Sequence, residues 1–173
     1  MIRLAAAFFI SCLVLLPLHA HAQRWAVFQP EGIGYSVELP GEWKIETGDL
    51  NSKAGTQKFY SAGVGMPGRS YLTGYSSYPE NIVRAATVSV LLDGARNGAI
   101  ENLKGQLRTE ERILISNLPG RHFIIDAPGN LVAVMNVFMV GNNLIQVIVV
   151  GPTGIELEPN TIRVLQSLKA VRQ

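Results

Sequence analysis

The chain has 173 residues, with 15 lysines and arginines against 13 aspartates and glutamates, and 47% of its residues are hydrophobic while 16% are charged. This composition excludes an intrinsically disordered chain, which combines low hydrophobicity with high net charge. The net charge of +2 is also too small for a surface that binds nucleic acid or a membrane through many phosphate contacts.

The first 22 residues have the pattern of a secretory signal peptide. A basic residue near the start precedes an apolar run over residues 4–18, and residues 20–22 (AHA) form a small-x-small cleavage site. The run is shorter than the roughly 20 residues of a membrane-spanning helix, and Cys12 lies inside it without the small-residue box of a lipoprotein. We therefore expect a cleaved signal peptide over residues 1–22 and a periplasmic protein over residues 23–173, without a membrane span.

Cleavage would remove the only cysteine and two of the three histidines. The mature chain would carry 14 basic against 13 acidic residues and a single histidine, His122. Because no thiol is left to form a disulfide, stability must come from a hydrophobic core, and a domain of about 150 residues buries roughly 68–70% of its unfolded surface. We expect residues 23–173 to form one compact domain.

Alternating apolar residues and flanking turn residues predict the strands of the first half of the chain. These strands are expected at residues 25–28, 35–39, 42–46, 57–61 and 71–76. A polar loop is expected over residues 47–55. The glycine-rich stretch 63–68 between the last two strands predicts a hairpin with a flexible tip.

A long helix is expected after the capping-box pattern of Ser77 and Glu80. Its apolar stripe steps by three or four residues. The stripe comprises Ala85, Val88, Leu92, Ala95, Ala99 and Leu103. Gly94 and Gly98 interrupt this helix and indicate either a close approach of the backbone to a neighbour or a break.

The second half of the chain has the pattern of an antiparallel meander that ends in a helix over residues 159–171. Its four strands are expected at residues 108–118, 121–126, 131–140 and 144–150, with turns at residues 119–120, 128–130 and 141–143. The strand over residues 131–140 is apolar on both faces, so both faces must be covered. We expect an α+β fold, a three-layer α/β/α sandwich around a mainly antiparallel sheet.

This order of elements resembles the PsbP-like α/β/α sandwich superfamily, which includes extrinsic photosystem subunits and exported bacterial proteins. The resemblance rests on the opening motif over residues 34–43 (GYSVELPGEW), the central helix, residues 118–121 (LPGR) and the closing residues 165–169 (LQSLK). It implies a non-enzymatic binding or accessory role. No metal-ligand motif of the superfamily has a match here, so no site residue is carried over.

Motifs for catalysis or cofactor binding do not meet their structural requirements. Residues 63–68 match G-x-G-x-x-G, but a strand rather than a helix is expected to follow, and Pro67 removes a phosphate-binding amide. No G-x-S-x-G elbow accompanies His122 and Asp126. A chain with one histidine and no cysteine lacks the usual zinc ligands. We therefore expect no enzymatic activity, no cofactor and no metal.

Glu156 and Glu158 leave weak calcium binding open, and their alternative role is that of two solvated charges before a helix. The segment with Arg108, Glu110, Glu111 and Arg112 is interpreted as a protected sheet edge. The alternative is that these charges form a rim for a protein partner.

Two groups of residues are the candidates for binding. The first lies in the glycine-rich hairpin, where tyrosines offer a large contact area at low entropic cost to a protein or envelope partner. It comprises Tyr60, Gly65, Arg69, Tyr71 and Tyr75. The alternative is that these tyrosines pack beside a helix.

The second group predicts a pocket for a small ligand or divalent ion. It comprises His122, Asn136 and Gln146, of which the last two interrupt apolar strands. Alternatively, Asn136 and Gln146 bond to each other across their hairpin and satisfy their buried polar groups.

Overall fold

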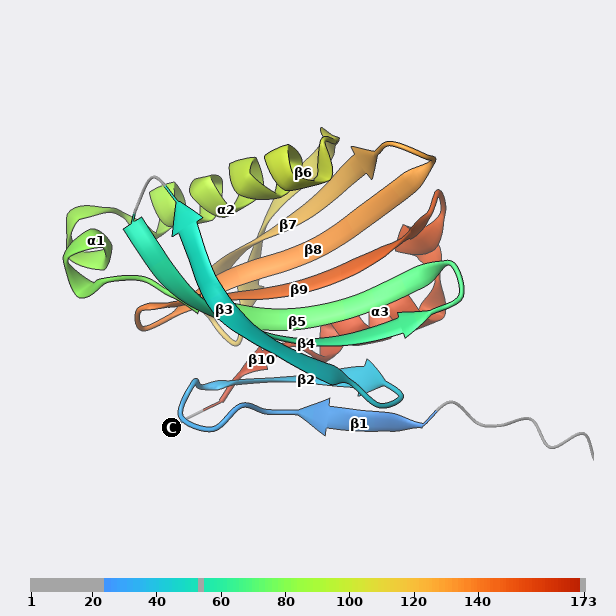
Figure 1. Cartoon of the computed structure of the whole chain (residues 1–173), viewed down its shortest axis with the longest axis horizontal. Coiled ribbons are helices and arrows are strands. Elements are labelled where there is room, and N and C mark those ends of the chain that lie inside the picture. Colours follow the sequence, from blue (N-terminus) through green and yellow to red (C-terminus); the bar gives the residue numbers. More distant parts are fainter. Residues whose placement is uncertain (1–23, 53–54, 172–173) are drawn as a thin grey trace, which may run out of the picture.

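The computed structural model describes residues 24–52 and 55–171, so the expected signal peptide lies outside the described residues. A seven-stranded antiparallel sheet, with the strand order β3-β4-β5-β9-β8-β7-β6, forms the centre of the structure (Figure 1). The strands are β3 (Lys44–Ser52), β4 (Gly55–Met66), β5 (Arg69–Ser77), β6 (Gln106–Ile115), β7 (Leu118–Ala127), β8 (Leu131–Val140) and β9 (Asn143–Pro152). Strands β3 and β6 are therefore the two edges of this sheet.

One face of the sheet packs against the helical segment between β5 and β6. It contains α1 (Glu80–Ala85) and α2 (Val88–Leu103), and α2 contacts β7 and β8 (Figure 1). The buried residues of this core are Leu91, Leu92, Phe123, Ile125, Ala133, Met135, Val137, Met139 and Leu144. Removal of these apolar side chains from water is the main force that holds the helix on the sheet.

The opposite face packs against the two ends of the described chain. Strands β1 (Trp25–Phe28), β2 (Tyr35–Pro40) and β10 (Lys169–Ala170) form a three-stranded sheet in the order β1-β2-β10. The 3₁₀-helix η1 (Ile155–Leu157) and α3 (Pro159–Ser167) complete this side, and α3 contacts β2. The final helix is thus shorter than expected, because the chain leaves it to pair with β2.

Strand β8 confirms the prediction that both of its faces are buried. Val132, Val134 and Phe138 belong to the core on the side of α3, whereas Ala133 and Met135 belong to the core under α2. Over the described residues, the fold is mostly an antiparallel sheet with three α-helices. On the α3 side, however, the helix shares the surface with the small sheet β1-β2-β10.

Two expected connections are parts of strands instead. Residues 47–52, expected as a loop, continue β3 and pair with β4 as far as Ser52 and Gly55. Polar residues suit this segment because residues 44–49 of the edge strand are exposed on both faces. The expected flexible tip is likewise reduced to the turn at Pro67 and Gly68, since Met66 pairs with Arg69.

The turn between β6 and β7 differs from the expected one. Ser116 and Asn117 form it with φ angles of 50° and 69°, as a two-residue turn between strands requires. Pro119 and Gly120 therefore lie inside β7, where Gly120 pairs with Ile113.

The helical segment also departs from its expected start. Ser77 does not cap a helix; its hydroxyl donates to Asn143 Oδ1 at 2.7 Å. The side chain of Thr87 instead caps α2 and accepts from the amide of Val90 at 3.4 Å. Gly94 and Gly98 face open space within a continuous helix, so neither alternative proposed for them holds.

Within residues 24–52 and 55–171, no helix combines the length and the apolar character that a membrane crossing needs.

Candidate functional site

The tyrosine-rich hairpin of β4 and β5 contributes mainly to the core. The rings of Tyr60 and Tyr75 stack with centroids 5.5 Å apart, and Phe28 of β1 stacks on Tyr60 at 6.1 Å. Both tyrosines are half-buried against the core on the α3 side. Their rings therefore pack between the small sheet and the large one, rather than beside a helix as the alternative for these tyrosines expected.

Tyr71 is fully buried, so the expectation that it contacts a partner is corrected. Its hydroxyl makes no hydrogen bond of good geometry among the described residues. The nearby Arg69 guanidinium interacts with it, and this contact raises the pKa of Arg69. Arg69 also forms an ion pair with Glu158. Gly65 is exposed in β4, so the accessible part of the hairpin is its turn region.

The residues of the expected ligand pocket lie on two faces of the sheet. His122 Nδ1 lies 2.8 Å from Asn136 Oδ1, and Asn136 Nδ2 donates to the Leu165 carbonyl of α3 at 3.3 Å. Because that carbonyl can only accept, the Asn136 oxygen faces His122 and accepts a hydrogen bond from its Nδ1–H group. The pair fastens the end of α3 to the sheet.

Gln146 takes no part in this contact. In the β8–β9 register Asn136 pairs with Val147, while Gln146 pairs with Val137. Neighbouring positions on a strand face opposite sides, so Gln146 lies on the α2 side and Asn136 on the α3 side. The bond expected between Asn136 and Gln146 is therefore absent, and the three residues do not form one pocket.

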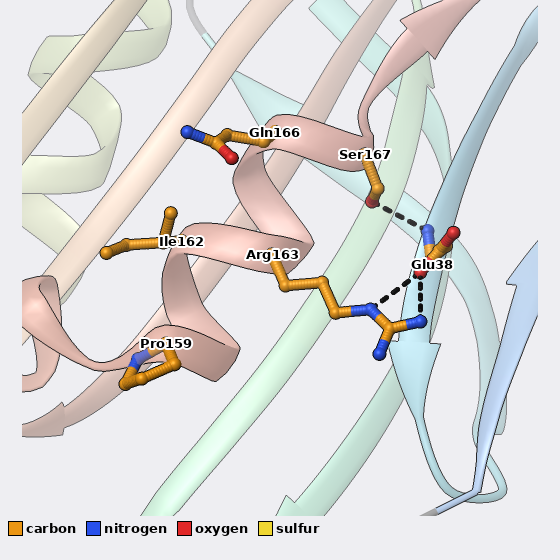
Figure 2. Close-up of a pocket in the computed structure, with 6 residues that line it drawn as sticks. All are labelled: Glu38, Pro159, Ile162, Arg163, Gln166 and Ser167. Atoms are coloured by element: carbon orange, nitrogen blue, oxygen red, sulfur yellow. Dashed lines mark hydrogen bonds and ion pairs between the residues drawn. The ribbon is translucent and has the colours of Figure 1, made fainter.

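A shallow groove of about 570 Å³ follows the outer side of α3 (Figure 2). The two charged residues of the groove, Arg163 and Glu38, form an ion pair in which Arg163 Nη2 lies 2.7 Å from Glu38 Oε2. The Arg163 guanidinium also lies 4.1 Å from the centroid of the Trp25 ring. Ser167 Oγ accepts a hydrogen bond from the backbone amide of Glu38 at 2.8 Å. These contacts hold α3 against β2 and leave no charge of the groove uncompensated.

The mixed-charge segment of β6 is divided by a register shift between Leu107 and Thr109. At the shift, Arg108 forms ion pairs with Asp126 and Glu156. Hydrogen bonding to Arg108 lowers the pKa of Asp126. Burial acts to raise the pKa of Glu156, but hydrogen bonds from backbone amides and Arg108 lower it overall.

Glu156 and Glu158 therefore serve different arginines and do not converge on one point. In the described part of the chain, no group of three or more His, Cys, Asp or Glu side chains is placed to hold a metal ion.

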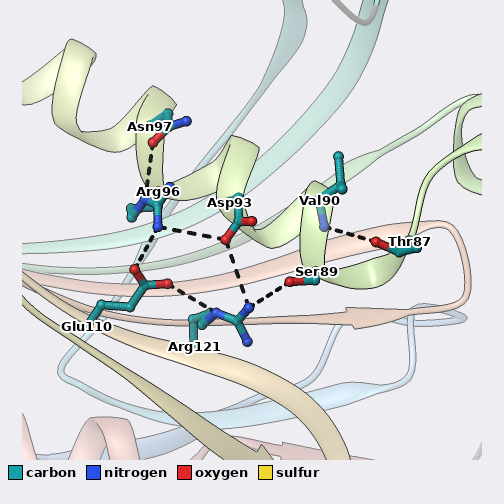
Figure 3. Close-up of polar contacts among 8 residues, drawn as sticks. All are labelled: Thr87, Ser89, Val90, Asp93, Arg96, Asn97, Glu110 and Arg121. Carbon is teal, nitrogen blue, oxygen red and sulfur yellow. Dashed lines mark hydrogen bonds and ion pairs between the residues drawn. The ribbon is translucent and has the colours of Figure 1, made fainter.

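A charged network joins α2 to the other part of β6 and to β7 (Figure 3). Arg121 is buried on the α2 side, where its Nε donates to Glu110 Oε1 at 3.1 Å and its Nη2 to Ser89 Oγ at 2.8 Å. Arg96 of α2 binds the other oxygen of Glu110 at 2.6 Å. Asp93 lies within 4 Å of both guanidinium groups.

Beside this network lies a hollow of about 340 Å³, which we call the β6–β7 corner. It is lined by Ser89, Arg112, Ile113, Leu114, Pro119, Gly120 and Arg121. In the strand register Arg112 lies directly opposite Arg121, so both side chains are on the α2 side of the sheet. Leu114 lies on the same side and is 72% exposed.

The corner carries an uncompensated positive charge. The two carboxylates nearby, Asp93 and Glu110, form ion pairs with Arg96 and Arg121. The side chain of Arg112 is exposed and makes no ion pair or hydrogen bond within the described residues. The corner thus combines a free guanidinium, an exposed leucine and an edge strand.

Sequence reasoning did not identify this site as a unit. It placed Arg112 in the mixed-charge segment and Arg121 at the start of the expected strand over residues 121–126. The alternation of Arg121 with Phe123 and Ile125 would have shown that this arginine shares the core-facing side of its strand.

No protein-family model and no curated protein sequence matches the chain. Among solved structures, the chain is similar to cyanobacterial PsbP (CyanoP) from Synechocystis sp. PCC 6803, with a TM-score of 0.56 and 9% identity, over 84% of this chain and 92% of that one. A protein of unknown function from Pseudomonas aeruginosa, PA94, gives a TM-score of 0.47 and 12% identity, over 86% of this chain and 99% of that one. The first likeness shows that the chain has a PsbP-like fold.

Proposed function

We propose that the chain is an exported, non-catalytic accessory protein that binds a protein partner at the β6–β7 corner. The observation that carries the proposal is the free Arg112 guanidinium beside the exposed Leu114 on an edge strand. A protein surface offers carboxylates and apolar side chains together, which matches this pair of groups. Arginine is also one of the residues that contribute most to binding at interfaces.

The sequence supports export of the protein to the periplasm. Residues 1–22 have the pattern of a cleaved signal peptide, and N-terminal sequencing of periplasmic protein should begin at Gln23. We further interpret the fold as a three-layer α/β/α arrangement, because α2 contacts one face of the large sheet and α3 lies on the other side. An accessory role agrees with the resemblance to the PsbP-like superfamily.

The corner is favoured over the two groups selected from the sequence. Within the hairpin, Tyr71 is buried and Arg69 is paired with Glu158. His122 and Asn136 are engaged with each other and with α3. By contrast, Arg112 and Leu114 present groups that the described residues leave accessible.

Site-specific photo-crosslinking in the cells that produce the protein tests this function. A photoreactive amino acid replaces Leu114 in the corner, and in separate variants it replaces Val27 or Leu157, which are exposed elsewhere. We expect one protein adduct from position 114 that is lost when Arg112→Glu is added. No adduct at position 114, or the same adducts from all three positions, would refute the proposal.

A further inference from the structure

The edge of the large sheet next to the corner has two unlike halves. Near its start, β6 has the register shift at Leu107 and Thr109, and Arg108 is held there by Asp126 and Glu156. Such an irregularity hinders the addition of another strand. From Thr109 to Ile115 the pairing with β7 is regular, and β6 has no neighbour on its other side among the described residues.

This regular half of β6 offers main-chain groups together with two selective side chains. Alternate backbone amides and carbonyls of an edge strand face away from the sheet and can pair with an added strand. Arg112 and Leu114 are two positions apart, so both face the same side of the sheet as the corner. A strand that pairs with β6 would place its own alternate side chains opposite these two residues.

Resting on the proposed function, we infer that the partner docks by adding an extended segment to β6, antiparallel to it, with an apolar residue opposite Leu114 and an acidic residue opposite Arg112. Antiparallel addition continues the pattern of the whole sheet. In that direction the segment reads apolar-x-acidic from its amino end. The carboxylate enters the corner beside Arg112, which has no competing carboxylate, because Glu110 and Asp93 are engaged by Arg96 and Arg121.

Short peptides with blocked ends test this docking mode on the mature protein. The probe has a leucine-threonine-glutamate centre in a threonine- and valine-rich background, and two further probes carry glutamine or lysine in place of glutamate. Binding is measured by fluorescence anisotropy. Amide hydrogen exchange of residues 109–115 is measured by NMR, with β3 on the opposite edge as the internal reference.

We expect the glutamate probe to slow exchange in β6 and not in β3. The glutamine probe should bind about tenfold more weakly, as for the loss of a charge-assisted hydrogen bond. Arg112→Glu should reverse the preference in favour of the lysine probe. The matched control Lys44→Glu makes the same charge change on the exposed edge strand β3 and should keep the original order. Thermal melting of both variants checks that they fold.

Equal affinity for the three probes, no protection in β6, or the same behaviour of Arg112→Glu and Lys44→Glu would overturn the inference. These outcomes are distinguishable from failure of the proposed function. If position 114 still crosslinks to a partner in cells, the function stands and only strand addition is refuted. If no adduct forms there, the function itself fails.

Discussion

Arg112 and Arg121 occupy opposed positions of β6 and β7, on the side of the sheet that α2 covers. Two like charges in this position are unfavourable unless something compensates them. Glu110 and Asp93 compensate the buried Arg121, whereas Arg112 remains exposed and unpaired within the described residues. Arg121 thus stabilises the fold, and Arg112 is accessible to a partner.

This division predicts different effects on stability for the two arginines. Arg121→Met should lower the free energy of unfolding by about 2–4 kcal/mol, because it breaks a buried charged network. The cost stays moderate because Glu110 keeps its bond to Arg96. Arg112→Met should change stability by less than about 0.5 kcal/mol, as for other surface sites. Urea unfolding measures both, and equal losses would contradict the assignment.

Gly74 and Gly94 predict opposite effects of the same substitution. A Cβ at Gly74 would lie 2.4 Å from the Tyr60 carbonyl oxygen of β4, so Gly74→Ala should destabilise the protein by about 1–3 kcal/mol. Gly94 lies in α2 and faces open space, so Gly94→Ala should stabilise it by about 0.5–1 kcal/mol. Thermal melting of the two variants checks the signs, and a stabilising Gly74→Ala would contradict the close approach of β5 to β4 at this position.

Tyr35 predicts a loss of stability at alkaline pH. Burial raises the pKa of its phenol, and its hydroxyl lies 3.3 Å from Thr73 Oγ1. A raised folded-state pKa means that the stabilisation is complete below the unfolded-state pKa of about 10 and falls as the pH rises above it. Tyr35→Phe should therefore reduce the drop in unfolding free energy between about pH 8 and about pH 10.5. An unchanged drop would contradict this role of Tyr35.

The ion pairs of Arg108 with Asp126 and Glu156 predict that the stability of the protein decreases at acidic pH. Arg108 lowers the pKa of Asp126 and contributes to the lowered pKa of Glu156. Lowered folded-state pKa values give stability that is present above the unfolded-state values of about 4 and is lost as the pH falls. Arg108→Gln should make the acid unfolding curve less steep, as followed by circular dichroism. An identical curve would show that these ion pairs contribute nothing to folding.

The sequence was sufficient for the order of strands β1 to β9. It was also sufficient for the two buried faces of β8, because alternation over residues 131–140 needs no knowledge of distant partners. Register was harder to predict. Asn136 and Gln146 are at similar distances from their turn, but Asn136 pairs with Val147, one residue away from Gln146. A shift of one residue moves a side chain to the other face of the sheet. The Ser116–Asn117 turn was missed because Pro119 and Gly120 gave a stronger turn signal nearby.

The corner could not be predicted for a related reason. Arg112 and Arg121 come together through the register of β6 and β7, and Ser89 reaches them only because α2 packs across the sheet. Neither the register of β6 and β7 nor the packing of α2 can be read from composition or from the local sequence pattern. The charge balance of the site depends on which carboxylates pair with which arginines, and this follows from tertiary packing.

The most direct test is the affinity of the mature protein for the partner identified by crosslinking at position 114, compared among wild type, Arg112→Glu and Lys44→Glu. We predict that Arg112→Glu weakens binding at least about tenfold while Lys44→Glu leaves it unchanged. Equal affinity of all three proteins would contradict the claim that the β6–β7 corner is the binding site.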